Sequence, residues 1–271
     1  MHYSGMPQTP PPRASARAMA RALASVAQLA PLAPCAALAR ALLLPDARCR
    51  LCALPSRAPL CAACQCAYSA AAVRRCARCA IALPVHAACC AACACRPPAF
   101  VRAVAWADYA PPLDRLALGI KFGGDAALAA WLGTLLALRV RETAPATPSL
   151  VMPVPLAASR LRQRGYNQAW ELARGVARSL GWPSDCGLLS RPREGQAQST
   201  LPLSRRAANV RSAFHARALA RGTRVLLVDD VMTSGSTAEH ASRALLRAGA
   251  AEVALAVLLR TPAPTRGDHM S

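Results

Sequence analysis

The chain has 271 residues and a formal net charge of +20, from 33 basic and 13 acidic side chains. Recurring Leu, Val and Ile segments exclude collagen-like and disordered proteins, and the length allows one large domain or two modest ones. Lys121 is the only Lys among the basic residues. We therefore interpret the excess of Arg as a coding bias in the first place, and as a sign of function only in the second. The charge alone therefore does not establish a nucleic-acid partner.

Residues 1–45 are rich in Ala and Arg. Three Arg residues precede an uncharged stretch at 22–39, as in a secretory signal. However, Pro31 and Pro34 interrupt this stretch, and Ala contributes little free energy to membrane insertion. We therefore expect a partly helical or disordered arm, no membrane span, and a cytoplasmic protein.

Eleven of the thirteen cysteines lie between Cys49 and Cys95. Such a block is either a disulfide framework in an exported chain or a metal site in a reduced compartment, and the expected cytoplasmic location favours metal. A single CxxC pair could be a redox dithiol, but four pairs in 45 residues indicate zinc. The pairs are Cys49 with Cys52, Cys61 with Cys64, Cys76 with Cys79, and Cys90 with Cys93.

Four such pairs predict a double zinc ribbon over residues 46–96, with two structural Zn²⁺ ions in closed four-thiolate shells. The spacing does not decide which pair joins which, since ribbons can interleave. Cys66, Cys89 and Cys95 are additional thiols. His86 could replace a thiolate ligand, although an exposed loop histidine is the simpler interpretation.

The periodicity changes after residue 96 and predicts an α/β domain over residues 97–261, followed by a tail at 262–271. Strands are expected at 100–109, 149–156, 188–189, 224–230 and 251–260, and helices at 113–121, 126–142, 168–180 and 236–248. Strands that alternate with helices indicate a parallel sheet flanked by helices. Residues 191–212 show no periodicity and are expected to form a long functional loop.

The segment from Val225 to Thr237 carries the main chemical signal. An apolar strand ends in Asp229 and Asp230, at the edge where open α/β sheets bind ligands. A hydroxyl-rich turn and a helix follow, so that N–H groups and a helix N-terminus can hold a phosphate. The carboxylates suit sugar hydroxyls or Mg²⁺, and the whole pattern indicates a ribose 5-phosphate.

This segment resembles the phosphoribosyl pyrophosphate motif of type I phosphoribosyltransferases. The resemblance implies that the two acids contact the ribose hydroxyls and that the turn holds the 5-phosphate, with Mg²⁺ accompanying the substrate. The turn consists of Thr233, Ser234, Gly235, Ser236 and Thr237.

A second set of motifs resembles the ComF family, in which a cysteine-rich module precedes this transferase domain. The match runs from about Cys49 to Arg260. It rests on PVPL at 153–156, the Arg164–Gln168 segment RGYNQ, the KFG turn at 121–123, and single positions from Gln198 to Phe214.

Arg160 and Arg164 follow the strand that ends at Leu156, where their guanidinium groups are placed to meet the leaving pyrophosphate. Arg205, Arg206 and Asn209 lie in the 191–212 loop and are candidates for a lid over the reacting centre. No residue is an obvious general base.

Two functions remain open. The first is a Mg²⁺-dependent phosphoribosyltransferase with an unidentified acceptor, linked to natural competence and DNA uptake. The second is a non-catalytic single-stranded DNA-binding protein of transformation, acting with competence proteins on a reused transferase scaffold. The ComF resemblance implies the DNA link, although the chain has few aromatic residues for base stacking.

Overall fold

The computed structural model describes residues 47–69, 73–84, 87, 89–143, 148, 150–191 and 214–263. The chain divides into two compact units, Met1–Asp46 and Ala47–Ser271, and every described residue belongs to the second. The expected arm at 1–45 and most of the expected tail lie outside the described residues. The boundary between ribbon and transferase at residue 97 stays a prediction.

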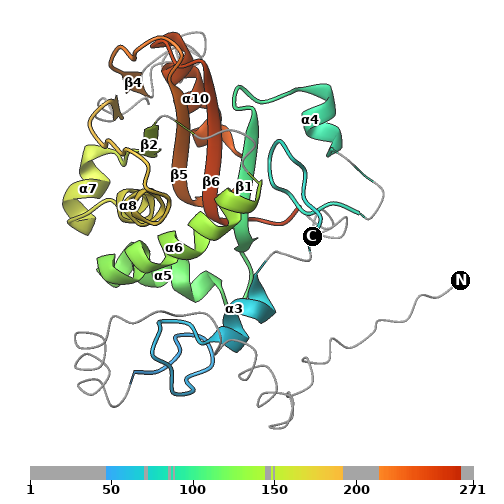
Figure 1. Cartoon of the computed structure of the whole chain (residues 1–271), viewed down its shortest axis with the longest axis vertical. Helices are drawn as coiled ribbons and strands as arrows, with labels where there is room; N and C mark the ends of the chain where they lie inside the picture. Colours follow the sequence, from blue (N-terminus) through green and yellow to red (C-terminus); the bar gives the residue numbers. More distant parts are fainter. Residues whose placement is uncertain are drawn as a thin grey trace, which may run out of the picture. The chain divides into compact units, whose positions relative to one another are not determined.

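A four-stranded sheet forms the centre of the second unit (Figure 1). Its strands run in the order β1 (Arg102–Asp108), β6 (Glu252–Arg260), β5 (Arg224–Met232) and β2 (Leu150–Pro153), and all neighbouring pairs are parallel. The strands are near-continuous apolar runs because both faces of the sheet are covered. This arrangement confirms the expected α/β fold.

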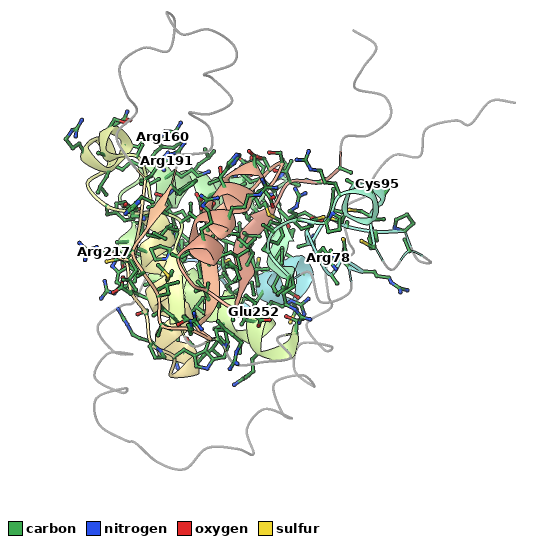
Figure 2. All side chains as sticks on the ribbon, turned by 90° about the horizontal axis from the view of Figure 1, so that it is seen from above. Arg78, Cys95, Arg160, Arg191, Arg217 and Glu252 are labelled. Atoms are coloured by element: carbon green, nitrogen blue, oxygen red, sulfur yellow. The ribbon has the colours of Figure 1, made fainter. Side chains whose placement is uncertain are left out.

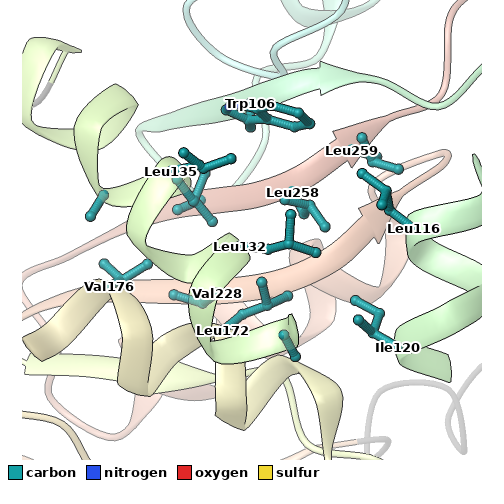
Figure 3. Close-up of a cluster of buried hydrophobic side chains, with 14 of the residues drawn as sticks. Trp106, Leu116, Ile120, Leu132, Leu135, Leu172, Val176, Val228, Leu258 and Leu259 are labelled. Carbon is teal, nitrogen blue, oxygen red and sulfur yellow. The ribbon is translucent and has the colours of Figure 1, made fainter. Parts of the chain in front are cut away.

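The alternation of side chains along β5 divides the core into two layers. Leu226 and Val228 point into a cluster with α5 (Asp114–Phe122), α6 (Ala126–Thr143) and α8 (Gln168–Leu180). Val225 and Leu227 point into the opposite cluster with α10 (Ser236–Arg247). Figure 3 shows the first cluster, in which Leu132 and Leu172 face the strands.

One helix was not expected from the sequence, and one short strand was expected without its partner. Helix α7 (Ala158–Arg164) was missed because none of its seven residues is buried, so that no apolar period marks it. The short strand expected at 188–189 is β3 (Leu189–Ser190), which pairs antiparallel with β4 (His215–Ala216). Within the described part of the chain, no helix has the length and apolar character needed to cross a bilayer.

Helices α6 and α8 touch through two glycines. A Cβ on Gly133 would lie 2.9 Å from the Cα of Gly175 and would overlap the carbonyl oxygen of Leu172. A Cβ on Gly175 would overlap the carbonyl oxygen of Ala130 in the same way. The backbones of the two helices are therefore in direct contact, which requires glycine at both positions.

The cysteine-rich region consists of two similar halves. Each half begins with a tight turn in which Ala53 or Ala80 has a left-handed backbone, with φ of 59° and 56°. In each turn the Arg directly before the first Cys donates to the carbonyl of that Ala: Arg48 to Ala53 at 3.1 Å, and Arg75 to Ala80 at 2.9 Å. A short helix completes each half, α3 (Ala62–Tyr68) in the first and α4 (Ala91–Cys95) in the second. Cys61 and Cys90 are the corresponding N-cap residues.

Candidate functional site

The expected phosphate turn lies at the carboxyl end of β5. Gly235 has a left-handed backbone, with φ of 82°, and is the N-cap of α10. This conformation turns the chain from the strand into the helix, which explains the single glycine in the turn. The remaining turn residues are exposed hydroxyl side chains: Thr233, Ser234, Ser236 and Thr237.

Asp230 is buried and held by three groups. Its Oδ1 accepts from the N–H of Val231 at 2.9 Å. Its Oδ2 lies 3.2 Å from Nζ of Lys121 in α5 and accepts from Nε2 of Gln168 at 3.4 Å. The cation compensates the desolvation of a carboxylate that is only 4% exposed.

Asp229 has no cation of its own in the described structure. Burial raises the pKa of Asp229 well above its usual range, and the neighbouring charge of Asp230 raises it further. The Asp230 N–H donates to Oδ1 of Asp229 at 2.9 Å and opposes the rise. Two acids therefore share one lysine, and the site favours an additional cation or hydroxyl donor.

The residues fit a sugar or a hydrated Mg²⁺. Oε1 of Gln168 is buried and has no hydrogen-bond partner among the described residues, although Nε2 of the same side chain contacts Asp230. This oxygen can accept from a ligand hydroxyl or from a metal-bound water. With Asp229 and Asp230 it makes an all-oxygen set, which is the kind that Mg²⁺ prefers.

The two expected pyrophosphate arginines differ in position. Arg164 ends α7 and lies over the ring of Phe122, 5.3 Å from its centroid, and Phe122 follows Lys121 in the chain. Tyr166 supports this contact because its hydroxyl donates to the carbonyl of Ile120. Arg160 is exposed on α7 and lies at the periphery in Figure 2. The recorded contact of Arg164 is with Phe122, the residue after Lys121, and no described contact joins either arginine to the acidic pair.

The lid candidates Arg205, Arg206 and Asn209 lie outside the described residues. Two site residues had no assigned role in the sequence analysis, Lys121 and Gln168. The signal for Lys121 was present, since it is the single Lys of an Arg-rich chain and stands in the KFG turn. Its partner Asp230 is 109 positions away, and only the fold shows that they meet.

The cysteines form two separate tetrads that pair in sequence order. One consists of Cys49, Cys52, Cys61 and Cys64, and the other of Cys76, Cys79, Cys90 and Cys93. Within each tetrad all sulfur atoms lie within 4.8 Å of one another, and every described cysteine is a free thiol. The two groups fit the closed four-thiolate shells of a double zinc ribbon, without interleaving.

One thiol in each tetrad has a lowered pKa, which favours its thiolate form. Burial alone would raise the pKa of Cys49, but the N–H groups of Cys52, Cys61 and Leu51 lower it to about 6. The equivalent Cys76 also has its pKa lowered to about 6, by N–H groups of Cys90, Cys79 and Arg78 that outweigh burial. Burial and the neighbouring sulfurs raise the pKa of Cys64 and Cys93. A bound cation would stabilise all four thiolates together.

Among the additional thiols, Cys89 is beside the second tetrad. Its sulfur lies 3.7 Å from that of Cys76, whereas Cys66 and Cys95 are exposed. His86, the alternative ligand, lies outside the described residues.

The fold and the turn at residues 233–237 define a phosphoribosyltransferase-type domain, and residues 167–270 match the family model described as "Phosphoribosyl transferase domain". The chain is 34% identical over 204 residues to "DNA utilization protein YhgH" of Salmonella typhi, covering 72% of this chain and 90% of that protein. It is 32% identical over 164 residues to "Competence protein F" of Haemophilus influenzae, covering 58% of this chain and 71% of that protein. The chain therefore belongs to the ComF family.

The solved structures that are similar to this chain include "Glutamine phosphoribosylpyrophosphate (PRPP) amidotransferase from B. subtilis complexed with ADP and GMP". It has 25% sequence identity and a TM-score of 0.36, and the match covers 49% of this chain and 26% of that chain.

Proposed function

We propose that this protein binds phosphoribosyl pyrophosphate together with Mg²⁺ and transfers the phosphoribosyl group to an acceptor that is not identified. The observation that carries the proposal is the paired Asp229 and Asp230 at the end of β5, followed directly by the hydroxyl turn and the N-terminus of α10. The acids would take the ribose hydroxyls and Mg²⁺, and the turn with the helix N-terminus would take the 5-phosphate.

Lys121 and Arg164 would supply positive charge at the other side of the site. In the free protein Lys121 pairs with Asp230, and Arg164 lies on Phe122. If Asp229 and Asp230 hold Mg²⁺, the ammonium group of Lys121 would be free to contact a phosphate of the ligand. Arg164 can hold the leaving pyrophosphate through two parallel N–H bonds while positive character develops at the anomeric carbon. Arg160 would also meet the leaving pyrophosphate, and the lid candidates Arg205, Arg206 and Asn209 would close over the bound substrate.

Isothermal titration of the zinc-loaded protein with phosphoribosyl pyrophosphate and Mg²⁺ tests the proposal. We expect binding by the wild type and a loss of about 100-fold or more in Asp229→Ala/Asp230→Ala, since hydrogen bonds to charged groups contribute about 1.5–3 kcal/mol each. Asp114→Ala, at the opposite end of α5 from Lys121, is the matched control and should bind normally. Absence of binding by the wild type, or equal binding by the double variant, would overturn the proposal.

The tetrads are proposed to hold two structural Zn²⁺ ions that stabilise the ribbon. Elemental analysis of the purified protein should give two zinc ions per chain, and one in Cys64→Ser, which removes a ligand of the first tetrad only. Chelation should lower the melting temperature, because the metal-binding free energy is part of the folding free energy. A wild-type protein with no bound zinc and an unchanged melting temperature after chelation would contradict this assignment.

A role in DNA uptake is the second candidate, and the similarity to a DNA utilization protein and to a competence protein favours it. In this case the protein would be a non-catalytic single-stranded DNA-binding protein of transformation. It would act in the cytoplasm with competence proteins. The charge of +20 allows contact with single-stranded DNA, and in Figure 2 Arg160, Arg191 and Arg217 lie on the same side of the view.

We expect affinity for single-stranded DNA to fall by about 10-fold or more between 50 and 200 mM salt, as phosphate contacts require. Fluorescence anisotropy with a labelled oligonucleotide measures it. Affinity that is independent of salt would contradict binding through these arginines.

A further inference from the structure

Arg260, the last residue of β6, is a buried arginine with an unusual set of partners. Its side chain is 6% exposed. Nε donates to the carbonyl of Cys79 at 2.9 Å, while Nη1 donates to the carbonyls of Met232 at 3.1 Å, Thr233 at 2.5 Å and Thr261 at 2.7 Å. One planar guanidinium group therefore joins a residue of the second cysteine tetrad to the last residue of β5 and the first residue of the phosphate turn.

The charge of Arg260 is not balanced by a carboxylate, because no ion pair of this side chain occurs among the described residues. Burying an unpaired guanidinium group is costly. A zinc ion bound by four thiolates carries net negative charge, and so does a phosphate held by the turn. Arg260 stands between these two sites and is stabilised by either.

Apolar packing also joins these regions, since Ala80 and Met232 belong to the same core cluster. A cavity of about 430 Å³ separates the two regions, and its walls include Cys90 and Cys93 on one side and Ser234 and Ser236 on the other. Arg260 lies in the wall of this cavity and is a polar contact between the two regions. The second half of the ribbon is anchored to the sheet itself by an ion pair of 2.8 Å between Arg75 and Asp108.

The first tetrad has a different position. Cys49 and Cys64 are buried in the core cluster with α5 and α6, and Arg50 forms an ion pair of 2.8 Å with Asp125 at the start of α6. No described hydrogen bond or ion pair joins this tetrad to residues 232–237. The two tetrads therefore offer an internal comparison, and Cys64 and Cys93 match closely, since each is 7% exposed and lies in the first turn of its helix.

We propose that Arg260 is a positioning residue that couples metal occupancy of the second tetrad to the conformation of the phosphate turn. When this tetrad loses its metal, the turn around Cys79 relaxes and the guanidinium group loses one anchor. The carbonyl of Thr233 is then held less tightly, whereas that of Met232 still accepts from the N–H of Thr261. Loss of metal from the first tetrad leaves the turn intact. The effect on ligand affinity rests on the proposed binding of phosphoribosyl pyrophosphate, whereas the effect on the turn does not.

The experiment compares Cys93→Ser with Cys64→Ser in the full-length protein, after elemental analysis has shown one zinc ion in each. Hydrogen–deuterium exchange of peptides covering residues 229–240 is measured first. We expect faster exchange in Cys93→Ser and wild-type exchange in Cys64→Ser. Titration with phosphoribosyl pyrophosphate and Mg²⁺ should show an affinity about 5- to 10-fold lower in Cys93→Ser only, which is a typical size for coupling between sites.

Arg260→Lys keeps the charge but cannot contact Cys79, Met232 and Thr233 together, because an ammonium group lacks the guanidinium fork. If Arg260 carries the coupling, turn exchange in Arg260→Lys/Cys93→Ser should equal that in Arg260→Lys alone. A purely structural role of Arg260 would make the two effects additive. Additive effects, or equal exchange in Cys93→Ser and Cys64→Ser, would overturn the proposal. If no form binds the ligand, the proposed function fails, while the exchange data still decide the coupling.

Discussion

Gly175→Ala is expected to destabilise the protein by about 3 kcal/mol, at the upper end of the range for overpacking a core. The added Cβ would overlap the carbonyl oxygen of Ala130 and lie 3.0 Å from the Cα of Gly133. Both atoms belong to the backbone of α6, so no side-chain rotation can relieve the contact, and the two helices must move apart. Urea denaturation followed by circular dichroism measures the change in the free energy of unfolding.

Gly119→Ala is the matched control, because Gly119 lies in α5 and its Cβ would meet no atom within 4 Å. Here alanine is expected to stabilise the helix by up to about 1 kcal/mol, the usual advantage of Ala over Gly. A Gly175→Ala protein as stable as Gly119→Ala would show that α6 and α8 do not touch through their backbones. The same reasoning applies to Gly133→Ala, whose Cβ would overlap the carbonyl oxygen of Leu172.

Asp229→Asn is expected to raise the melting temperature at neutral pH while it removes binding of phosphoribosyl pyrophosphate. In the free protein, burial and the charge of Asp230 raise the pKa of Asp229 above its value in the unfolded chain. The folded protein then binds this proton more tightly than the unfolded chain, so stability falls as the pH rises through the folded pKa. Asparagine cannot ionise and avoids this loss.

Because the pKa of Asp229 is raised on folding, the change in stability caused by Asp229→Asn depends on pH. The stabilisation by Asp229→Asn should be largest at neutral and alkaline pH and should disappear as the pH falls to about 4, where the carboxyl is protonated even in the unfolded chain. Thermal scans across this range measure it. Asp125→Asn removes a carboxylate that accepts from the N–H of Leu128 and pairs with Arg50, so it serves as a control without stabilisation. If Asp229→Asn destabilised the protein equally at every pH, the raised pKa of Asp229 in the folded protein would be contradicted.

Most regular elements could be predicted because each carries its own periodic pattern. Helix α8 begins and ends at the expected residues, Gln168 and Leu180, since its apolar spacing is strong and Gly181 in a left-handed conformation ends it. Strand β5 was also expected, and its burial on both faces agrees with its continuous apolar run. Helix α7 escaped because an element without buried residues leaves no hydrophobic period in the sequence.

The site was predictable where it is local in sequence and not where it depends on distant segments. The acids and the hydroxyl turn occupy consecutive positions, so their chemistry could be read directly. The contacts of Lys121 and Gln168 with Asp230, and of Arg164 with Phe122, come from α5, α8 and α7, which the fold brings together.

The sequence by itself determined the class of domain, the hydroxyl-rich turn after the acidic pair and the presence of four CxxC pairs, because each helix, strand, turn or CxxC pair carries its own local pattern of residues. Only the tertiary structure decided that the tetrads pair in order, that one lysine serves a strained pair of acids, and that Arg260 joins the second tetrad to the turn. The physical reason is that such contacts compensate buried charge between segments far apart in the chain, and no local pattern of residues records which partner the packing will supply.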